Sequence, residues 1–176
     1  MTEEAADLVR VQRVEGLEPL VCRVLSSTSE CIIATELSDS LDLDGICIVP
    51  TGTVRCFDRA FERADFYRAA LSAWPRSDAH SALLGEFACS LVEDLQLLAK
   101  RGDTVAIHME IKEPDVCYVG TIREVSEARL LLARVSSRGE FIAEPLEIDL
   151  TTVTKIEVAT RYLIAVGHAA RLLAAK

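Results

Sequence analysis

The segment SDSLDLDGICIV holds the residues best suited to binding a metal ion: Asp39, Asp42, Asp44 and Gly45. A calcium loop needs alternating oxygen ligands, a glycine at its sixth position and a bidentate glutamate at its twelfth. Counting from Ser40 places two of the aspartates and the glycine correctly, but Thr51 occupies the twelfth position. Since a solvated Asp-Gly turn before a strand explains the same residues, we predict a turn, with no metal and no cofactor.

The three histidines, His80, His108 and His168, are far apart in the sequence. Folding can bring a Cys–His or Ser–His catalytic pair together in space. The sequence contains no G-x-S-x-G, no H-E-x-x-H and no Walker-type Gly-Lys loop that would mark a site locally. We therefore interpret the histidines as surface or hydrogen-bonded side chains, and we predict no catalytic residue.

Six cysteines occur without a C-x-x-C motif or a His pair at zinc-ligand spacing: Cys22, Cys31, Cys47, Cys56, Cys89 and Cys117. Most of them lie inside apolar runs, where a free cysteine behaves as a small buried hydrophobe. We predict reduced thiols in the core.

Two features are candidates for binding a partner. The first is a set of four arginines within one stretch of sequence: Arg123, Arg129, Arg134 and Arg138. The second is Trp74, the only tryptophan, which can serve as an aromatic anchor because aromatic residues are enriched at interface centres. The alternative for Trp74 is packing of a helix end against the sheet.

The elements that position these residues show an internal duplication. DLVRVQRVEGLEPLVCRV from Asp7 matches DTVAIHMEIKEPDVCYVGTI from Asp103, and later segments match in the same order. Each copy reads as five short strands rich in Val, Ile, Leu and Thr, followed by a helical stretch. The strands are predicted over 7–14, 20–27, 30–37, 44–49 and 53–58, and over 104–111, 116–125, 128–136, 143–149 and 153–158. Short, sequentially connected strands favour a small closed barrel, which removes exposed edges.

The predicted organisation is a first barrel unit with its helix over 1–76, a connecting helix over 77–102, and a second barrel unit with its helix over 103–176. The connecting segment has one apolar stripe at helical spacing: Leu84, Phe87, Ala88, Leu91, Leu95 and Leu98. Gly102 follows Lys100 and Arg101, as expected at the C-terminal end of a helix.

One stretch resembles the second and third strands of Sm-like proteins. Its residues are Gly120, Ile122, Val125, Ser126 and Leu130–Leu132. The resemblance implies two tandem five-stranded Sm-like or SH3-like barrels in a mainly β (α+β) protein, as in bacterial proteins that carry such barrels in tandem. It also implies RNA binding, but Ser126 and Arg129 stand where the family usually places Asp and Asn.

Composition limits the partners. The chain has 176 residues, a formal charge of −9 and 5% aromatic residues. This acidity disfavours a protein whose main task is to neutralise phosphates, and RNA modules need basic grooves with aromatic platforms. The first ten residues carry acids where a secretory signal carries bases, and no apolar run approaches the ~18 residues of a spanning helix. We therefore expect a cytoplasmic protein without a membrane partner.

Three hypotheses of function follow. The first is a non-enzymatic interaction or scaffold protein that binds a protein partner or associates with itself, since a duplicated unit carries no assembled catalytic motif. The second is an Sm-like RNA- or DNA-binding regulator, which requires the four arginines to gather on one face. The third is an enzyme whose site lies at the junction of the two barrels, in a pocket lined by His, Cys or carboxylates.

Overall fold

The computed structural model describes residues 8–72, 83 and 85–175. The strands are β1 (Leu8–Arg13), β2 (Leu20–Ser27), β3 (Cys31–Leu37), β4 (Leu43–Pro50), β5 (Val54–Asp58), β6 (Thr104–His108), β7 (Cys117–Val125), β8 (Arg129–Arg134), β9 (Leu146–Asp149) and β10 (Lys155–Val158). The α-helices are α1 (Ala64–Ser72), α3 (Leu91–Arg101) and α4 (Arg161–Ala174). Short 3-10 helices, η2 (Thr51–Thr53) and η4 (Leu150–Thr152), join β4 to β5 and β9 to β10.

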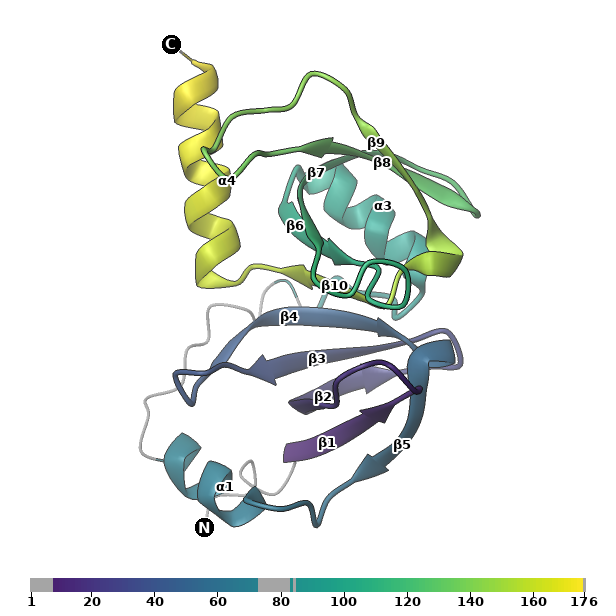
Figure 1. The fold of residues 1–176 in the computed structure, drawn as a ribbon, viewed down its shortest axis with the longest axis vertical. Coiled ribbons are helices and arrows are strands. Elements are labelled where there is room, and N and C mark those ends of the chain that lie inside the picture. Colours follow the sequence, from purple (N-terminus) through teal and green to yellow (C-terminus); the bar gives the residue numbers. More distant parts are fainter. Residues whose placement is uncertain (1–7, 73–82, 84, 176) are drawn as a thin grey trace.

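All ten strands form one open antiparallel sheet in the order β5-β1-β2-β3-β4-β10-β6-β7-β8-β9 (Figure 1). The prediction of two separate five-stranded barrels is therefore wrong, although the protein is α+β. A barrel closes when its two end strands pair with each other. Here β4 pairs instead with β10, so the first five strands do not close on themselves.

The two halves of the sheet have the same strand order. In the first half the fifth strand lies beside the first, giving β5-β1-β2-β3-β4, and the second half repeats this as β10-β6-β7-β8-β9. The halves meet where the fourth strand of one lies against the fifth strand of the other. We call this contact between β4 and β10 the joint.

The largest hydrophobic core crosses the joint. It contains Cys31, Ile33, Ile46 and Ile48 from the first half together with residues of α3 and most strands of the second half. The opposite face of β3 and β4 packs on β1 and β2 in a second core. Strands buried on both faces read as continuous apolar runs, which explains the sequences CIIA and GICIV.

The connecting helix predicted over 77–102 is interrupted within its described part: residues 85–90 are not helical, and α3 follows them. α3 begins at Leu91 because Cys89 has a left-handed backbone (φ 58°), which interrupts the apolar stripe. Leu95 and Leu98 of the stripe are fully buried, whereas Leu84 lies outside the described residues. Gly102 adopts a left-handed conformation (φ 67°) and ends the helix, as predicted.

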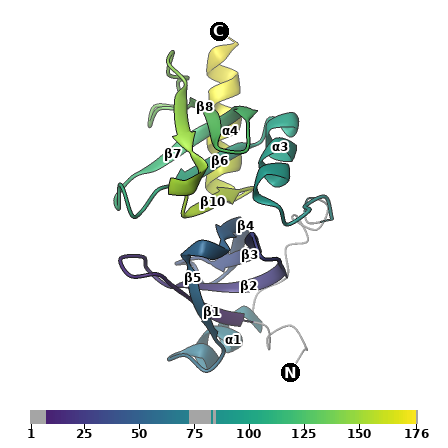
Figure 2. The ribbon, with the colours of Figure 1, turned by 90° about the vertical axis from the view of Figure 1, so that its right-hand side faces the viewer.

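The helices cover different parts of the sheet. α3 packs on β7 and α4 on β6, so both belong to the second half, while α1 lies at the far end of the first half (Figure 2). α4 approaches β6 so closely that a Cβ on Gly167 would lie 2.2 Å from the Thr104 hydroxyl oxygen. Among the described residues, no helix is both long and apolar enough to cross a membrane.

Candidate functional site

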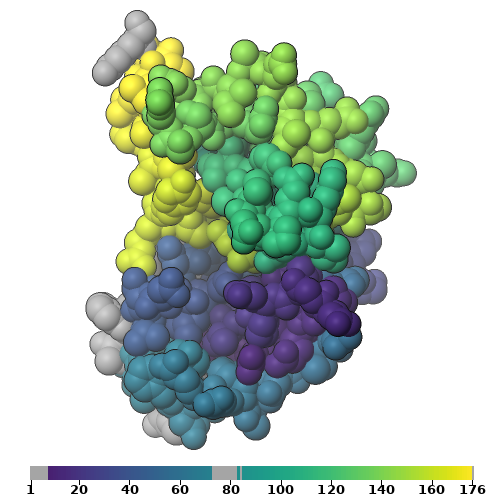
Figure 3. Space-filling view, in the orientation of Figure 1, coloured from purple at the N-terminus to yellow at the C-terminus, as the bar shows by residue number. Residues whose placement is uncertain are grey.

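The joint is apolar along its strands. Ile156 lies opposite Ile48, and Val158 lies opposite Ile46. All four side chains are buried to 1% exposure or less. In the space-filling view the two halves pack against each other along this seam (Figure 3).

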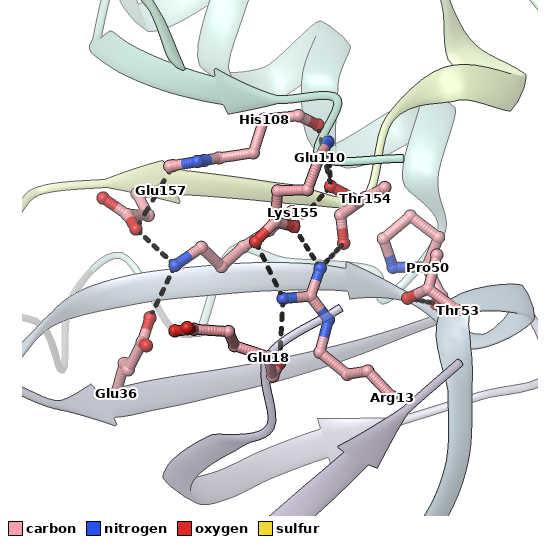
Figure 4. Close-up of polar contacts among 10 residues, drawn as sticks. All are labelled: Arg13, Glu18, Glu36, Pro50, Thr53, His108, Glu110, Thr154, Lys155 and Glu157. Carbon is pink, nitrogen blue, oxygen red and sulfur yellow. Dashed lines mark hydrogen bonds and ion pairs between the residues drawn. The ribbon is translucent and has the colours of Figure 1, made fainter. Parts of the chain in front are cut away.

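A buried guanidinium ties the halves together beside these strands. Arg13, at the end of β1, forms a two-pronged pair with the Glu110 carboxylate of the second half, and its side chain is fully buried (Figure 4). It also donates to the Glu18 and Thr154 carbonyl oxygens, both at 3.3 Å. The Thr154 hydroxyl donates to Glu110 at 2.6 Å. Glu110 is therefore held by two groups, one from each half.

A second ionic group lies next to the first. The Lys155 ammonium of β10 is 3.0 Å from Glu36 of β3 and 2.7 Å from Glu157, so it bridges the halves (Figure 4). His108 Nε2 is 3.3 Å from the same Glu157 carboxylate. We call Arg13, Glu36, His108, Glu110, Thr154, Lys155 and Glu157 the joint network.

The network keeps its charges. Burial alone would raise the pKa of Glu157, but contacts with His108 and Lys155 lower it to about 2. Burial likewise opposes ionisation of Glu110, and the hydrogen bonds from Arg13 and Thr154 still hold its pKa below the usual value. Burial would lower the pKa of Lys155, but Glu36 and Glu157 raise it well above its ordinary range. Charge-assisted hydrogen bonds outweigh desolvation at each of these groups.

A hollow of about 330 Å³ opens beside the joint. Its lining includes Glu36, Asp44, Cys47, Glu157 and Tyr162. Burial raises the pKa of the Cys47 thiol, so this group is a poor nucleophile, and Glu157 is held ionised by its partners. A catalytic acid or base needs a pKa near the working pH, so these two groups offer little support for the enzyme hypothesis.

The two ends of the sheet are strand edges. β5 exposes Arg55, Cys56 and Phe57, and the Phe57 side chain is 49% exposed although it is large and apolar. β9 exposes Glu147 and Asp149. An edge strand presents unpaired backbone N–H and C=O groups to any chain that can pair with it.

A second hollow, of about 340 Å³, lies beside the β9 edge. The β9 residues that line it include Glu147, Ile148 and Asp149, and its lining also includes Glu113 and Tyr118. Tyr118 donates its hydroxyl to the Glu113 carboxylate at 2.5 Å, and this bond, together with burial, raises the pKa of the phenol. Lys112 and Arg129 also line the hollow, so it is an amphipathic site that holds both carboxylates and cations.

The four predicted arginines lie on β7, on β8 and in the loop that follows β8. Two of them already bind a carboxylate or a carbonyl oxygen of the same chain. Arg129 pairs with Glu147 at 3.1 Å, and Arg134 donates to the Glu144 carbonyl oxygen at 3.5 Å. Arg123 and Arg138 are exposed. Trp74, the predicted aromatic anchor, lies outside the described residues, as does His80.

The aspartate segment forms a turn that packs on α4. Asp42 and Asp44 pair with Arg161, and Asp44 also accepts from the Arg161 backbone N–H at 3.1 Å. The turn is formed by Ser38–Asp42, earlier than predicted, whereas Asp44 and Gly45 lie inside β4, where Gly45 has a left-handed backbone (φ 67°). Four cysteines are buried as predicted, whereas Cys56 and Cys117 are exposed.

The sequence analysis missed the joint network. Arg13 continues the inward face of Val9 and Val11, and such a charge at an inward position is a signal of a buried ion pair. Its partner, Glu110, lies 97 residues away. No local pattern links residues so far apart.

Comparisons with protein-family models, with curated proteins and with solved structures found no match, so the resemblance to Sm-like proteins stays a prediction.

Proposed function

We propose that this protein is a non-enzymatic scaffold whose copies associate edge to edge, with β9 of one copy pairing with β5 of the next. The observation that carries the proposal is the joint. In the joint, the fourth strand of the first half (β4) pairs with the fifth strand of the second half (β10). The fifth strand of the first half (β5) and the fourth strand of the second half (β9) remain at the two ends of the sheet.

The joint also supplies a register for this contact. When the two halves are aligned so that η2 matches η4, Ile48 of the first half corresponds to Glu147 of the second. Phe57 of the first half then corresponds to Ile156 of the second. Ile48 lies opposite Ile156 in the joint. The same pairing between copies would set Glu147 of one copy opposite Phe57 of the next. Two residues farther along the β9 strand, Asp149 would lie opposite Arg55. The second pair is a match of opposite charges across an antiparallel ladder, which stabilises strand pairing.

The hollow beside β9 supports the same contact. In the joint, Glu110 and Thr154 of the second half fill the space beside Arg13. In the alignment of the two halves, Arg55 of the first half corresponds to Thr154 of the second. Arg55 of a neighbouring copy would then enter the hollow whose rim carries Glu147 and Asp149. The contact joins two different edges, β5 of one copy and β9 of the next, so it is directional.

Such a contact is head to tail. Repeated head-to-tail contacts close into a ring when the rotation permits and otherwise form a filament. The six cysteines are free thiols, which supports a reducing compartment, and the proposal places the protein in the cytoplasm.

Light scattering over a range of concentrations tests the association. Wild type is expected to form oligomers above the monomer mass. Phe57→Glu sets a carboxylate opposite Glu147 of the next copy, and like charges directly opposite oppose pairing, so this variant is expected to be monomeric. Adding Glu147→Lys to Phe57→Glu replaces the repulsion with an attraction and is expected to restore the oligomer.

Phe66→Glu is the matched control, because Phe66 is also 49% exposed but lies on α1 and not on an edge strand. Circular dichroism spectra must agree among the variants. The proposal is wrong if wild type is a monomer at every concentration, or if Phe57→Glu and Phe66→Glu change the oligomer equally.

A further inference from the structure

Two buried thiols lie in contact at the entrance to α3. The sulfur atoms of Cys31 and Cys89 are 3.7 Å apart, and the two side chains belong to residues 58 positions apart in the sequence. Cys31 is 0% exposed and Cys89 is 4% exposed. Cys31 begins β3 of the first half, and Cys89 immediately precedes the N-cap of α3, which packs on the second half.

The backbone around this pair is held in place. Cys89 has a left-handed φ of 58°, which is uncommon for a residue with a side chain. The Thr28 hydroxyl donates to the Cys89 carbonyl oxygen at 2.7 Å, and the Cys89 thiol donates to the Cys31 carbonyl oxygen at 3.2 Å. The Leu91 backbone N–H donates to Glu30 at 3.3 Å. These contacts join the turn before β3 to the backbone that leads into α3, and they bring the two sulfurs together.

We propose that Cys31 and Cys89 are a site of reversible oxidation, at which a hydroperoxide converts the two thiols into a disulfide that ties the β2–β3 turn to the start of α3. The inference does not depend on edge-to-edge association. The disulfide would close a loop over residues 31–89, which holds β3, β4, β5 and α1 of the first half, and would fix its end at the start of α3.

The chemistry balances with hydrogen peroxide as the oxidant. Cys89 sulfur attacks one peroxide oxygen, the O–O bond breaks, and a sulfenic acid and one water form. Cys31 sulfur then attacks the sulfenic sulfur, the S–O bond breaks, and a second water leaves as the S–S bond forms. The two thiols together lose two electrons and two protons, and the peroxide is reduced to two waters.

The roles of the two cysteines follow from their surroundings. Burial, and then the hydrogen bond and charge of Cys89, raise the pKa of Cys31, with a further contribution from Asp94. A thiol held protonated is a slow nucleophile toward peroxide. Cys89 is 4% exposed and Cys31 is 0% exposed, so peroxide meets Cys89 first and Cys31 resolves the sulfenic acid.

The test uses the full chain with the two exposed thiols removed, Cys56→Ser/Cys117→Ser, and hydrogen peroxide alone as the probe. Intact mass spectrometry is expected to show the loss of two hydrogen atoms, and peptide mapping without reductant is expected to find Cys31 linked to Cys89. A thiol reductant should reverse the change. The oxidised protein is expected to melt several degrees higher, since a cross-link across a long loop restricts the unfolded chain.

Cys22 and Cys47 are matched internal controls, because both are buried and both are expected to remain free thiols. Adding Cys31→Ala or Cys89→Ala should each prevent the loss of hydrogen, with folding checked by circular dichroism. The inference is overturned if all four remaining thiols stay free after treatment, if Cys22 or Cys47 is linked instead, or if oxygen adds to Cys31 or Cys89 without a link between them.

Discussion

The joint and the free edges consist of strands in the same positions of their halves, but they are built with different chemistry. At the joint, Lys155 and Glu36 are 3.0 Å apart and mostly buried; at the β9 edge, Arg129 and Glu147 are 3.1 Å apart and more than 60% exposed. The separation is almost the same, whereas solvent screens only the second pair. The two pairs therefore differ in burial and hardly at all in distance.

The difference extends to the apolar residues. Ile156 of the joint is 0% exposed, and Phe57, its counterpart on β5 in the alignment of the two halves, is 49% exposed. The joint buries aliphatic side chains on both strands, whereas the free edges retain an aromatic residue on β5 and carboxylates on β9. A contact between copies through edges of this composition is expected to depend on the protein concentration and on the salt concentration. The joint, by contrast, forms when the chain folds.

Removing the guanidinium of the joint should have the largest effect. Arg13→Ala leaves the Glu110 carboxylate without its main partner, and breaking a buried pair from one side is expected to cost about 3 kcal/mol of the free energy of unfolding, or more. Urea denaturation measures this loss. Replacing both partners, with Arg13→Met and Glu110→Leu together, should recover most of it. If the free energy of unfolding of Arg13→Ala lies within ~0.5 kcal/mol of the wild-type value, the pair with Glu110 does not stabilise the joint.

Crowding the joint should have the next largest effect. A Cβ on Gly45 would lie 2.5 Å from the Thr160 methyl carbon and 2.8 Å from the Val158 carbonyl oxygen, at a φ of 67°. Gly45→Ala is therefore expected to lower stability by about 2 to 3 kcal/mol. Gly52→Ala is the control, because a Cβ there meets nothing within 4 Å. Equal thermal melting of the two variants would contradict the close packing of the 38–45 turn on the second half.

Acid should weaken the joint through Glu157. A carboxyl whose pKa is lower in the folded chain than in the unfolded chain favours folding above its unfolded pKa, and this contribution disappears as the pH falls toward its folded pKa. With a pKa lowered from 4.5 to about 2, Glu157 should contribute on the order of 2 kcal/mol at neutral pH, lost between about pH 5 and pH 2. Urea midpoints measured across this range should fall less steeply for Glu157→Gln. Identical slopes would show that the pair with Lys155 gives no net stabilisation.

The exposed pair at the β9 edge should have the smallest effect on folding. Arg129→Ala removes the ion pair with Glu147, yet it is expected to change the free energy of unfolding by less than ~0.5 kcal/mol, because solvated pairs contribute little. Added salt should not alter this result. A loss comparable to that of Arg13→Ala would remove the distinction between edge and joint.

Much of the secondary structure could be predicted from alternation and turn residues alone. Apolar alternation, together with the continuous apolar runs of β3 and β4, located the ten strands, and Gly102 marked the end of α3 because only a left-handed residue fits there. The start of α3 could not be found in this way. Leu91, Leu95 and Leu98 continue a stripe that begins earlier in the sequence, and the break at Cys89 arises from its contacts with Cys31 and Thr28 in the first half.

The sequence by itself determined which segments are strands, because the period of two in apolar side chains is a local property of a half-buried strand. It also determined the acidic charge and the apolar runs of β3 and β4. Only the tertiary structure decided that the ten strands form one open sheet. Closure of a five-stranded barrel and pairing of β4 with β10 satisfy the same backbone groups, and local alternation does not distinguish them. The choice depends on contacts between residues about a hundred positions apart, Arg13 with Glu110 and Lys155 with Glu36, which exist only when both halves are folded.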